Sequence, residues 1–258
     1  MQSSADRGTA AWYVISLRPA GQHAALRRAA MRAGAGFVAV STSRIVARND
    51  AATRAALRAA LAAPVVVFTS PNAVRHAAAI AALRDRRGRI ACAVGEGTAA
   101  ALRRAGMRDV HVPARADSEG LLALDALQSL AGGDVGLVTA PGGRDRIAPG
   151  LQARGARVLR ADVYERVPAA PRAQAWTALR AAQGRGWIAA SSGEALAAFA
   201  QQAPADLRVG ALRVVAGSAR LASLARTLGF ERVVVADGAR PAELVAAARD
   251  GGRRQAFR

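Results

Sequence analysis

Hydroxyl-bearing, small and arginine residues follow the apolar runs of this 258-residue chain. Backbone N–H groups at helix starts attract anions, and the carboxyl ends of parallel strands meet at one edge of a sheet. N-capping explains any one of these turns alone, because helix starts prefer the same residue types. Together, in an arginine-rich chain, they predict an anion-binding site. Its candidate residues are Arg18, Thr69, Ser70, Asn72, Gly95, Thr98, Gly142, Gly143, Arg144, Ser191, Ser192 and Ser218.

The composition limits the chemistry that such a site could perform. The chain has 37 basic and 18 acidic residues, a net charge of +19, and every basic residue is an arginine. Schiff-base chemistry, lysine-bound pyridoxal phosphate and a Walker phosphate loop each need an amine, so all three are excluded. One cysteine, and three histidines without metal-ligand spacing, argue against a disulfide framework and a zinc site. We therefore expect no metal.

A partial dinucleotide-binding pattern gives an alternative reading of one turn. Gly95-x-Gly97-x-x-Ala100 follows an apolar run, and Asp117 comes about twenty residues later, as in nicotinamide or flavin sites. The predicted helix is short, however, and the corresponding later turn, Gly217-Ser218, has no second glycine. We expect no organic cofactor.

Strand and helix patterns alternate along the chain and must position these turns. The apolar runs are nearly continuous, which is typical of parallel strands covered on both faces. Predicted strands are Trp12–Leu17, Phe37–Ile45, Val65–Thr69, Ile90–Val94, Val110–Val112, Val135–Thr139, Val158–Tyr164, Trp187–Ala190, Leu212–Ala216 and Val233–Ala236. Predicted helices include Gln22–Ala33, Ala51–Ala62, Asn72–Leu83, Thr98–Ala105, Leu121–Ala131, Ala195–Gln201, Leu221–Leu228 and Ala242–Arg249, several of them ending at a glycine. This alternation predicts a doubly wound α/β fold with flavodoxin-like strand–helix units.

The chain also resembles itself at a nearly constant spacing. Val66–Val74 aligns with Ile188–Leu196, and Ala93–Gly106 aligns with Ala216–Gly229. Two further pairs of segments align at similar spacing: Ser118–Leu122 with Pro241–Val245, and Val14–Gly34 with Leu137–Gly155. A constant spacing over several segments indicates a duplicated unit.

The order of the repeats predicts two lobes, one inserted into the other. Lobe 1 is expected at 11–38 plus 168–258 and lobe 2 at 48–157, with connector strands at 39–47 and 158–167 and a flexible tail at 1–10. Two crossing connectors would form a hinge, and ligands of α/β proteins bind in such clefts and at sheet edges.

Tyr164 is the one candidate for acid–base chemistry. It is one of two tyrosines, lies on the second predicted connector and is flanked by Asp162 and Glu165. Its phenol could donate a proton into the cleft, or its ring could simply pack at the hinge. The residues leave both readings open.

Several of these stretches, in this order and spacing, resemble the uroporphyrinogen-III synthase family. The matching stretches are Val14–Pro19, Val66–Val74, Ala93–Gly106, Ser118–Leu122, Pro141–Arg144, Val163–Arg166 and Val233–Asp237, which together span about residues 12–250. The resemblance implies two α/β lobes joined by a two-stranded connector. It also implies a cofactor-independent hydro-lyase that converts hydroxymethylbilane, a linear tetrapyrrole with eight carboxylates, to uroporphyrinogen III. That reaction expels the terminal hydroxyl, inverts the last pyrrole ring and closes the macrocycle.

The resemblance also assigns roles to individual residues. Tyr164 matches the connector tyrosine that is the family's favoured proton donor, and Thr98 matches its hydroxyl in the A-V-G-x-x-T turn. The C-terminal repeat departs from the family, because Leu221 stands where many members have a second threonine. Ser218 is our hypothesis for the missing hydroxyl.

Two other function classes remain as alternatives. The charge of +19 could indicate a basic nucleic-acid-binding protein, although the arginines are spread over nearly every helix with few aromatic residues between them. A two-lobed protein could also close on an anion without catalysis. Because no apolar run approaches about 18 residues and the polar start resembles no signal peptide, we expect a cytoplasmic protein without a membrane partner. The resemblance implies a role in heme biosynthesis, and we expect a monomer that binds no nucleic acid.

Overall fold

Two compact units make up the structure, a computed structural model that describes residues 10–115, 117–142 and 146–256. Unit 1 comprises the chain up to Arg44 and from Val167 onward, and unit 2 comprises Ile45–Arg166. The tail predicted at 1–10 lies, except for Ala10, outside the described residues. Two α/β units are the predicted fold class, which the structure confirms.

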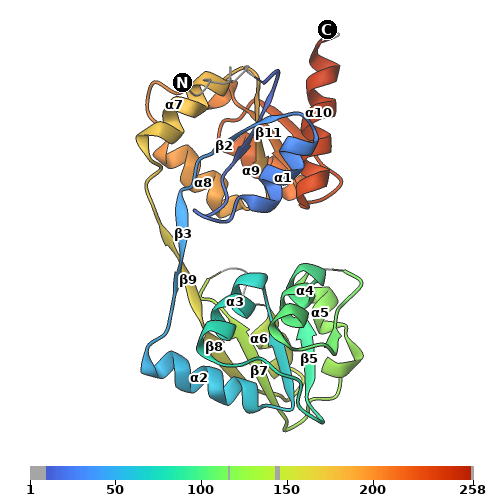
Figure 1. Cartoon of the computed structure of the whole chain (residues 1–258). Coiled ribbons are helices and arrows are strands. Elements are labelled where there is room, and N and C mark those ends of the chain that lie inside the picture. The colour runs from blue at the N-terminus through green and yellow to red at the C-terminus, as the bar shows by residue number, and fades with distance from the viewer. Residues whose placement is uncertain (1–9, 116, 143–145, 257–258) are drawn as a thin grey trace, which may run out of the picture. The chain divides into compact units, whose positions relative to one another are not determined.

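Each unit contains one five-stranded sheet in which all neighbouring strands are parallel (Figure 1). Unit 1 has the order β12-β11-β10-β1-β2, and unit 2 has the order β6-β5-β4-β7-β8. The strands of unit 1 are β1 (Tyr13–Ser16), β2 (Gly36–Ala39), β10 (Gly186–Ala190), β11 (Arg213–Ala216) and β12 (Arg232–Val235). Those of unit 2 are β4 (Val65–Phe68), β5 (Ile90–Ala93), β6 (Val110–His111), β7 (Asp134–Thr139) and β8 (Arg157–Asp162).

Helices cover both faces of each sheet. In unit 1 they are α1 (Ala24–Arg32), α7 (Ala173–Ala182), α8 (Gly193–Gln202), α9 (Ala219–Thr227) and α10 (Pro241–Ala256), with a 3-10 turn η2 (Val209–Ala211). In unit 2 they are α2 (Ala51–Ala62), α3 (Pro71–Ile80), α4 (Glu96–Ala105), α5 (Ser118–Leu122) and α6 (Ile147–Gln152), with a 3-10 turn η1 (Asp125–Leu127).

Alternation along each strand sends neighbouring side chains to opposite faces. In β1, Val14 packs with α1 and α10, whereas Ile15 packs with α7, α8 and α9. In β4, Val67 faces α5 and α6, whereas Phe68 faces α2, α3 and α4. Both faces are therefore apolar, which explains why the strand sequences read as continuous hydrophobic runs.

The two sheets have the same strand order once the chain is permuted. Reading from one edge, unit 1 gives β2-β1-β10-β11-β12 and unit 2 gives β8-β7-β4-β5-β6. The segments that aligned in the sequence occupy equivalent positions, because β4 corresponds to β10 and β5 to β11. The shared order is that of flavodoxin-like folds, 2-1-3-4-5.

The chain passes between the units in two paired strands, β3 (Ser43–Ala47) and β9 (Tyr164–Pro168). Backbone bonds from Arg48 N–H to Val163 O (3.0 Å) and from Ala169 N–H to Thr42 O (3.0 Å) show that the pair runs antiparallel. The sequence assigned all of 158–167 to a connector, but 157–162 forms β8 within the sheet of unit 2.

Two other predicted boundaries were wrong. The single strand predicted at 37–45 is two strands, because the chain leaves the unit 1 sheet after β2 and then pairs with β9. The helix predicted at 121–131 is the short α5 followed by η1. In an α-helix, the backbone carbonyls of this segment would accept hydrogen bonds from backbone N–H groups. Here the side chains of Gln128 and Arg154 donate to these carbonyls instead, and the acceptors are the carbonyls of Leu122, Leu124 and Leu127.

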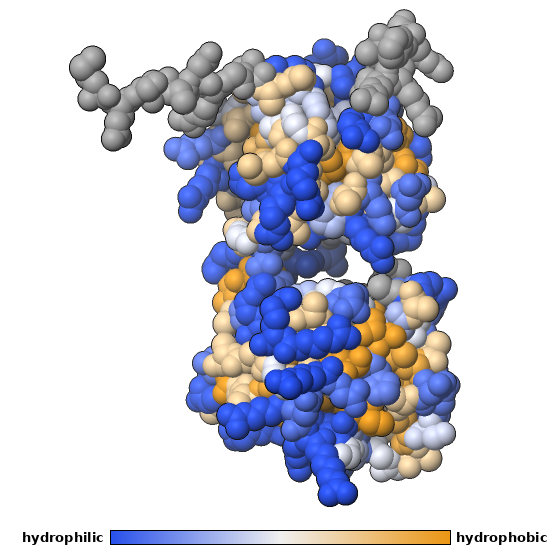
Figure 2. All heavy atoms as spheres, turned by 45° about the vertical axis from the view of Figure 1, so that its right-hand side comes forward, coloured by the Kyte–Doolittle hydropathy of each residue, from blue (hydrophilic) through white to orange (hydrophobic). Residues whose placement is uncertain are grey.

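Hydrophilic and hydrophobic residues are interspersed on the face of the molecule shown in Figure 2. On the face in Figure 2, strongly hydrophilic residues lie over both units instead of gathering on one. Within the described ranges, no helix is long and apolar enough to cross a membrane.

Candidate catalytic and anion-binding residues

The predicted turns of unit 2 lie at the carboxyl ends of its parallel strands. Ser70 caps α3 after β4, accepting a hydrogen bond from Ala73 N–H at 3.0 Å. Gly95 is the N-cap of α4 after β5, and Thr98 lies in the first turn of that helix with its side chain buried. A Cβ atom at Gly97 would lie 3.9 Å from the Pro71 ring, so the first turns of α3 and α4 are neighbours. Two helix N-termini therefore share one edge of the sheet.

Tyr164 belongs to this edge. It begins β9, is only 9% exposed and packs into the core of unit 2 beside α3. Its hydroxyl lies 3.0 Å from Ser70 Oγ, and its ring stacks on His76 with centroids 5.5 Å apart. Burial, and then the charge of Arg75, lower the pKa of His76, so that imidazole is neutral at neutral pH.

The Ser70 contact leaves the phenol able to act as a proton donor. Either hydroxyl can donate in this pair, and because Ser70 Oγ accepts from Ala73 N–H, its own proton is available for the Tyr164 oxygen. A phenol that accepts from Ser70 has its own O–H free for another acceptor. This geometry suits a proton donor whose developing negative charge is held by a hydroxyl.

The neighbouring polar residues of unit 2 are paired within the protein. Thr69 Oγ1 donates to Thr139 Oγ1 at 2.8 Å, which links the ends of β4 and β7. Asn72 accepts from the Arg75 guanidinium at 2.8 Å on the exposed side of α3. Gly142 is exposed with a positive φ of 83°, whereas Gly143 and Arg144 lie outside the described residues.

Unit 1 repeats the pattern of hydroxyl caps. Ser192 caps α8 and Ser218 caps α9, each accepting a backbone N–H at 3.3 Å, and the exposed Ser191 precedes Ser192. Ser218 occupies the position equivalent to Gly95, the N-cap, and not that of Thr98 in the first turn. Its hydroxyl is therefore at the helix start, one turn away from where a substitute for Thr98 would lie.

Arg18 is the predicted site residue with the most unusual environment. It follows β1 in unit 1, and among the described residues no acceptor or carboxylate contacts its guanidinium. Its Nε atom is buried without a hydrogen-bond partner, and burial lowers the pKa of the group. A partly buried guanidinium whose Nε has no partner among the described residues is costly, and a bound anion would reduce that cost.

A histidine network holds the backbone of this arginine. Ser16 Oγ lies 2.9 Å from His23 Nδ1, and His23 Nε2 lies 2.8 Å from Ser41 Oγ. Ser41 Oγ donates to Arg18 O at 2.9 Å, and Arg18 N–H points to Ser16 Oγ at 3.4 Å. Both peptide groups of Arg18 are thus bound to the same network.

The sequence offered no signal for several of these residues. The spacing of the histidines argued only against a metal site, and it did not reveal that His76 stacks on Tyr164 or that His23 is hydrogen-bonded to Ser16 and Ser41. Ser16, Ser41 and Thr139 were not among the candidates. These contacts join residues between 7 and 94 positions apart in the chain, and spacing along the sequence cannot reveal them.

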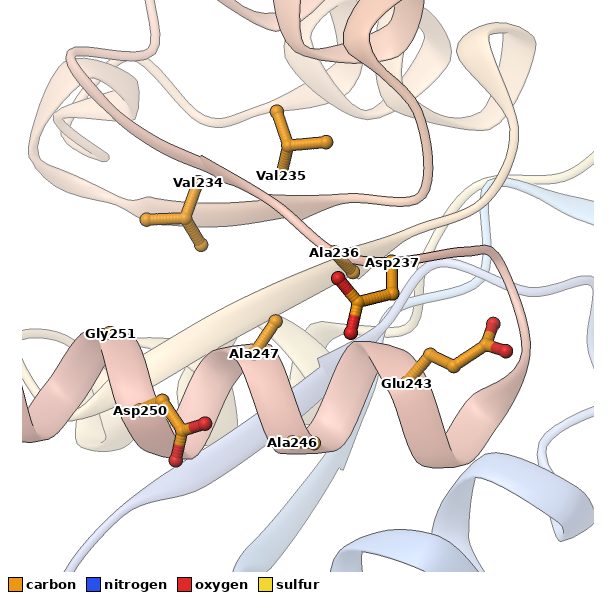
Figure 3. Close-up of a pocket in the computed structure, with 9 residues that line it drawn as sticks. All are labelled: Val234, Val235, Ala236, Asp237, Glu243, Ala246, Ala247, Asp250 and Gly251. Carbon is orange, nitrogen blue, oxygen red and sulfur yellow. The ribbon is translucent and has the colours of Figure 1, made fainter.

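An acidic hollow in unit 1 lies away from these residues. It has a volume of about 280 Å³ and lies between β12 and α10. Figure 3 shows the carboxylates of Asp237, Glu243 and Asp250 at its wall. Glu243 accepts from Arg240 N–H at 2.9 Å and so caps α10. A negatively charged hollow repels carboxylates and is no site for an anionic ligand.

Comparison with known proteins identifies the family. The family model of uroporphyrinogen-III synthase HemD matches residues 24–246. The chain belongs to this family. Curated uroporphyrinogen-III synthases of Escherichia coli (strain K12) and Salmonella typhimurium (strain LT2) are each 35% identical to it over 155 residues. The alignment covers 57% of this chain and 61% of each relative, so the chain spans about three fifths of the length of these relatives.

Solved structures of the HemD family share the fold. A uroporphyrinogen III synthase mutant of Thermus thermophilus aligns with a TM-score of 0.57 at 18% identity, covering 95% of this chain and 100% of that one. The uroporphyrinogen-III synthetase of Helicobacter pylori 26695 aligns with a TM-score of 0.60 at 14% identity, covering 96% and 100%. At these identities the likeness concerns the arrangement of strands and helices.

Proposed function

We propose that this HemD-family chain is a uroporphyrinogen-III synthase, which converts hydroxymethylbilane to uroporphyrinogen III with loss of water. Membership of the family supports the reaction. The residues present support the substrate class, because the chain offers helix N-termini to a ligand with eight carboxylates, together with Arg18, whose buried Nε has no partner among the described residues. Each unit supplies such groups at the carboxyl edge of its own sheet.

Binding of the carboxylates would use many weak donors. Serine caps occupy the N-termini of α3, α8 and α9, and Gly95 leaves the N-terminus of α4 without a side chain. Their backbone N–H groups carry partial positive charge and need no lysine. Arg18 adds a full charge in unit 1. The proposal therefore assigns the substrate-binding role to all the turn residues predicted from the sequence, Gly143 and Arg144 included.

Tyr164 would act at the leaving hydroxyl. The carbon–oxygen bond of the terminal hydroxymethyl group breaks, the oxygen takes a proton from the phenol, and water leaves. The bonding electrons depart with the oxygen, so a cationic pyrrole remains for ring closure. Ser70 Oγ, 3.0 Å from the phenol oxygen, would donate to the tyrosinate that forms.

The single observation that carries this proposal is the Tyr164–Ser70 contact at a helix N-terminus of a HemD-family chain. The test is to incubate the purified chain with freshly made hydroxymethylbilane and to separate the product isomers. Formation of the type III isomer supports the proposal. Formation of the type I isomer alone, which arises without an enzyme, would refute it and favour an anion-binding protein without catalysis.

Two finer predictions belong to the same proposal. We propose that the chain works as a monomer. Light scattering after size-exclusion chromatography measures this directly. We also propose a cytoplasmic location, where the other steps of heme biosynthesis would supply the substrate, and cell fractionation tests it.

A further inference from the structure

The network around Arg18 has only one consistent hydrogen-bond direction. Ser41 Oγ donates its single proton to Arg18 O, so it can only accept a hydrogen bond from His23. The proton of the neutral imidazole must therefore be on Nε2. Nδ1 of the neutral ring is then an acceptor for the Ser16 hydroxyl. Ser16 Oγ in turn accepts from Arg18 N–H. The result is a closed ring of hydrogen bonds that begins and ends on the peptide groups of Arg18.

The ring requires a neutral imidazole. A proton on Nδ1 would turn the Ser16 hydroxyl around and leave its hydrogen without this acceptor. The charged groups near His23 oppose that proton: Arg18 lies in the same loop, and Arg27 lies on α1 with its guanidinium 4.5 Å from the Phe37 ring centroid. The Phe37 ring of β2 contacts the imidazole edge-on at 6.1 Å. Burial and these two arginines lower the pKa of His23.

Nucleophilic catalysis does not explain the network. Ser16 is 0% exposed, so its oxygen cannot reach a substrate. Ser41 already donates its proton to Arg18 O, so the histidine has no proton to remove from it. What the ring does is fix the loop in which Arg18 lies.

We propose that His23 is a positioning residue that holds Arg18 ready to bind a carboxylate of the ligand. The identity of that ligand rests on the proposed function, whereas the coupling between His23 and Arg18 does not. Arg18 has no protein partner for its guanidinium among the described residues, so the loop must be held through its backbone. In the native protein this ring of hydrogen bonds already orders the loop that carries Arg18. Without these hydrogen bonds, the loop would become ordered only when the ligand binds, and the entropy lost in that step would weaken binding.

The test is a double-mutant cycle with uroporphyrin III, a stable porphyrin with eight carboxylates, as the probe. His23→Ala is expected to weaken binding about tenfold, because two hydrogen bonds that fix the loop are lost. Arg18→Gln is expected to weaken it about 10- to 100-fold, as for a charged hydrogen bond. The double variant should bind within about twofold of Arg18→Gln alone, because His23 acts only through Arg18. His111→Ala, at an exposed strand end, is the control and should bind like the wild type.

Two further measurements separate positioning from a general structural role. Ser41→Ala keeps His23 but breaks the bond to Arg18 O, so it should show the same non-additivity even if His23→Ala folds poorly. In an NMR titration, uroporphyrin III should raise the pKa of His23 in the wild type, since a carboxylate at Arg18 offsets a nearby positive charge. That rise should vanish in Arg18→Gln.

The outcomes distinguish this inference from the proposed function. The positioning role would be overturned if the affinity losses of the two single variants multiplied in the double variant, or if the rise in the His23 pKa persisted in Arg18→Gln. Either result would count against it even in a chain that forms the type III isomer. Non-additive losses in a chain that forms only the type I isomer would support the positioning role while the proposed reaction fails.

Discussion

Replacing Tyr164 by phenylalanine removes one oxygen and leaves the surrounding contacts in place. The ring keeps its stacking on His76, and Ser70 keeps its cap on α3. The hydrogen bond between the phenol and Ser70 Oγ, at 3.0 Å, is lost. The variant therefore isolates the contribution of the hydroxyl.

The structural and the catalytic cost of this change differ in size. One neutral hydrogen bond contributes about 1 kcal/mol to stability, which for a chain of this length lowers Tm by roughly 2–4 °C. Loss of a general acid lowers kcat by about 10²- to 10⁴-fold, equivalent to roughly 3–5 kcal/mol in the barrier. A loss of that size cannot come from the hydrogen bond alone.

The assay is steady-state formation of uroporphyrinogen III, with the product oxidised and its isomers separated. We expect kcat to fall at least 100-fold while KM changes little, because the phenol acts on the transition state. Tyr13→Phe is the matched control, since Tyr13 is the other tyrosine and lies in unit 1. A kcat for Tyr164→Phe within threefold of the control would refute the proton-donor role.

Three further predictions concern stability and reactivity. In a denaturant titration, Gly136→Ala should destabilise unit 2 by about 1–3 kcal/mol or prevent folding, because the added Cβ would clash with the Ala60 carbonyl oxygen. Gly97→Ala should be tolerated, because its added Cβ would lie 3.9 Å from the Pro71 ring, an ordinary van der Waals contact. Because the pKa of His23 is lower in the folded chain than the ordinary histidine value of 6.5, the unfolded chain takes up the proton first, and the free energy of unfolding should fall as the pH drops below 6.5. An equally steep fall in the His23→Ala variant would contradict this. Cys92 is 0% exposed and burial raises the pKa of its thiol to about 12, so it should react with a thiol reagent at pH 8 only on unfolding, and rapid labelling of the native chain would be the contrary result.

The fold could be predicted largely because strands buried on both faces have a distinctive sequence. Val65–Phe68 and Gly186–Ala190 are entirely buried, and their continuous apolar character marks them. The terminal glycines Gly34, Gly106 and Gly229 all have the positive φ expected after a helix. Where local pattern failed, side chains from elsewhere decided the outcome, as Arg154 does for the carbonyls after α5.

The site could be predicted only in part. Local sequence determines where a hydroxyl caps a helix, so the sequence pattern could predict Ser70, Ser192 and Ser218 as N-caps. The contact between Ser70 and Tyr164 joins residues 94 positions apart, and it depends on the strand order of unit 2. The ring through His23 likewise needs β1 and β2 to be neighbours. Neither the Ser70–Tyr164 contact nor the hydrogen bonds of His23 can be predicted from the spacing of residues along the chain.

In the proposed function, the absence of lysine leaves backbone N–H groups and arginine as the groups that would bind the carboxylates. Arg18 is the clearest instance, since its charge is partly buried and has no acidic partner within the described residues.

The central claim is that this chain directs ring closure with inversion of the last pyrrole. The most direct measurement is the isomer ratio formed from freshly prepared hydroxymethylbilane at increasing enzyme concentration. We expect the type III isomer to become the dominant product as the enzyme concentration increases. A product that stays entirely type I at every concentration would contradict it.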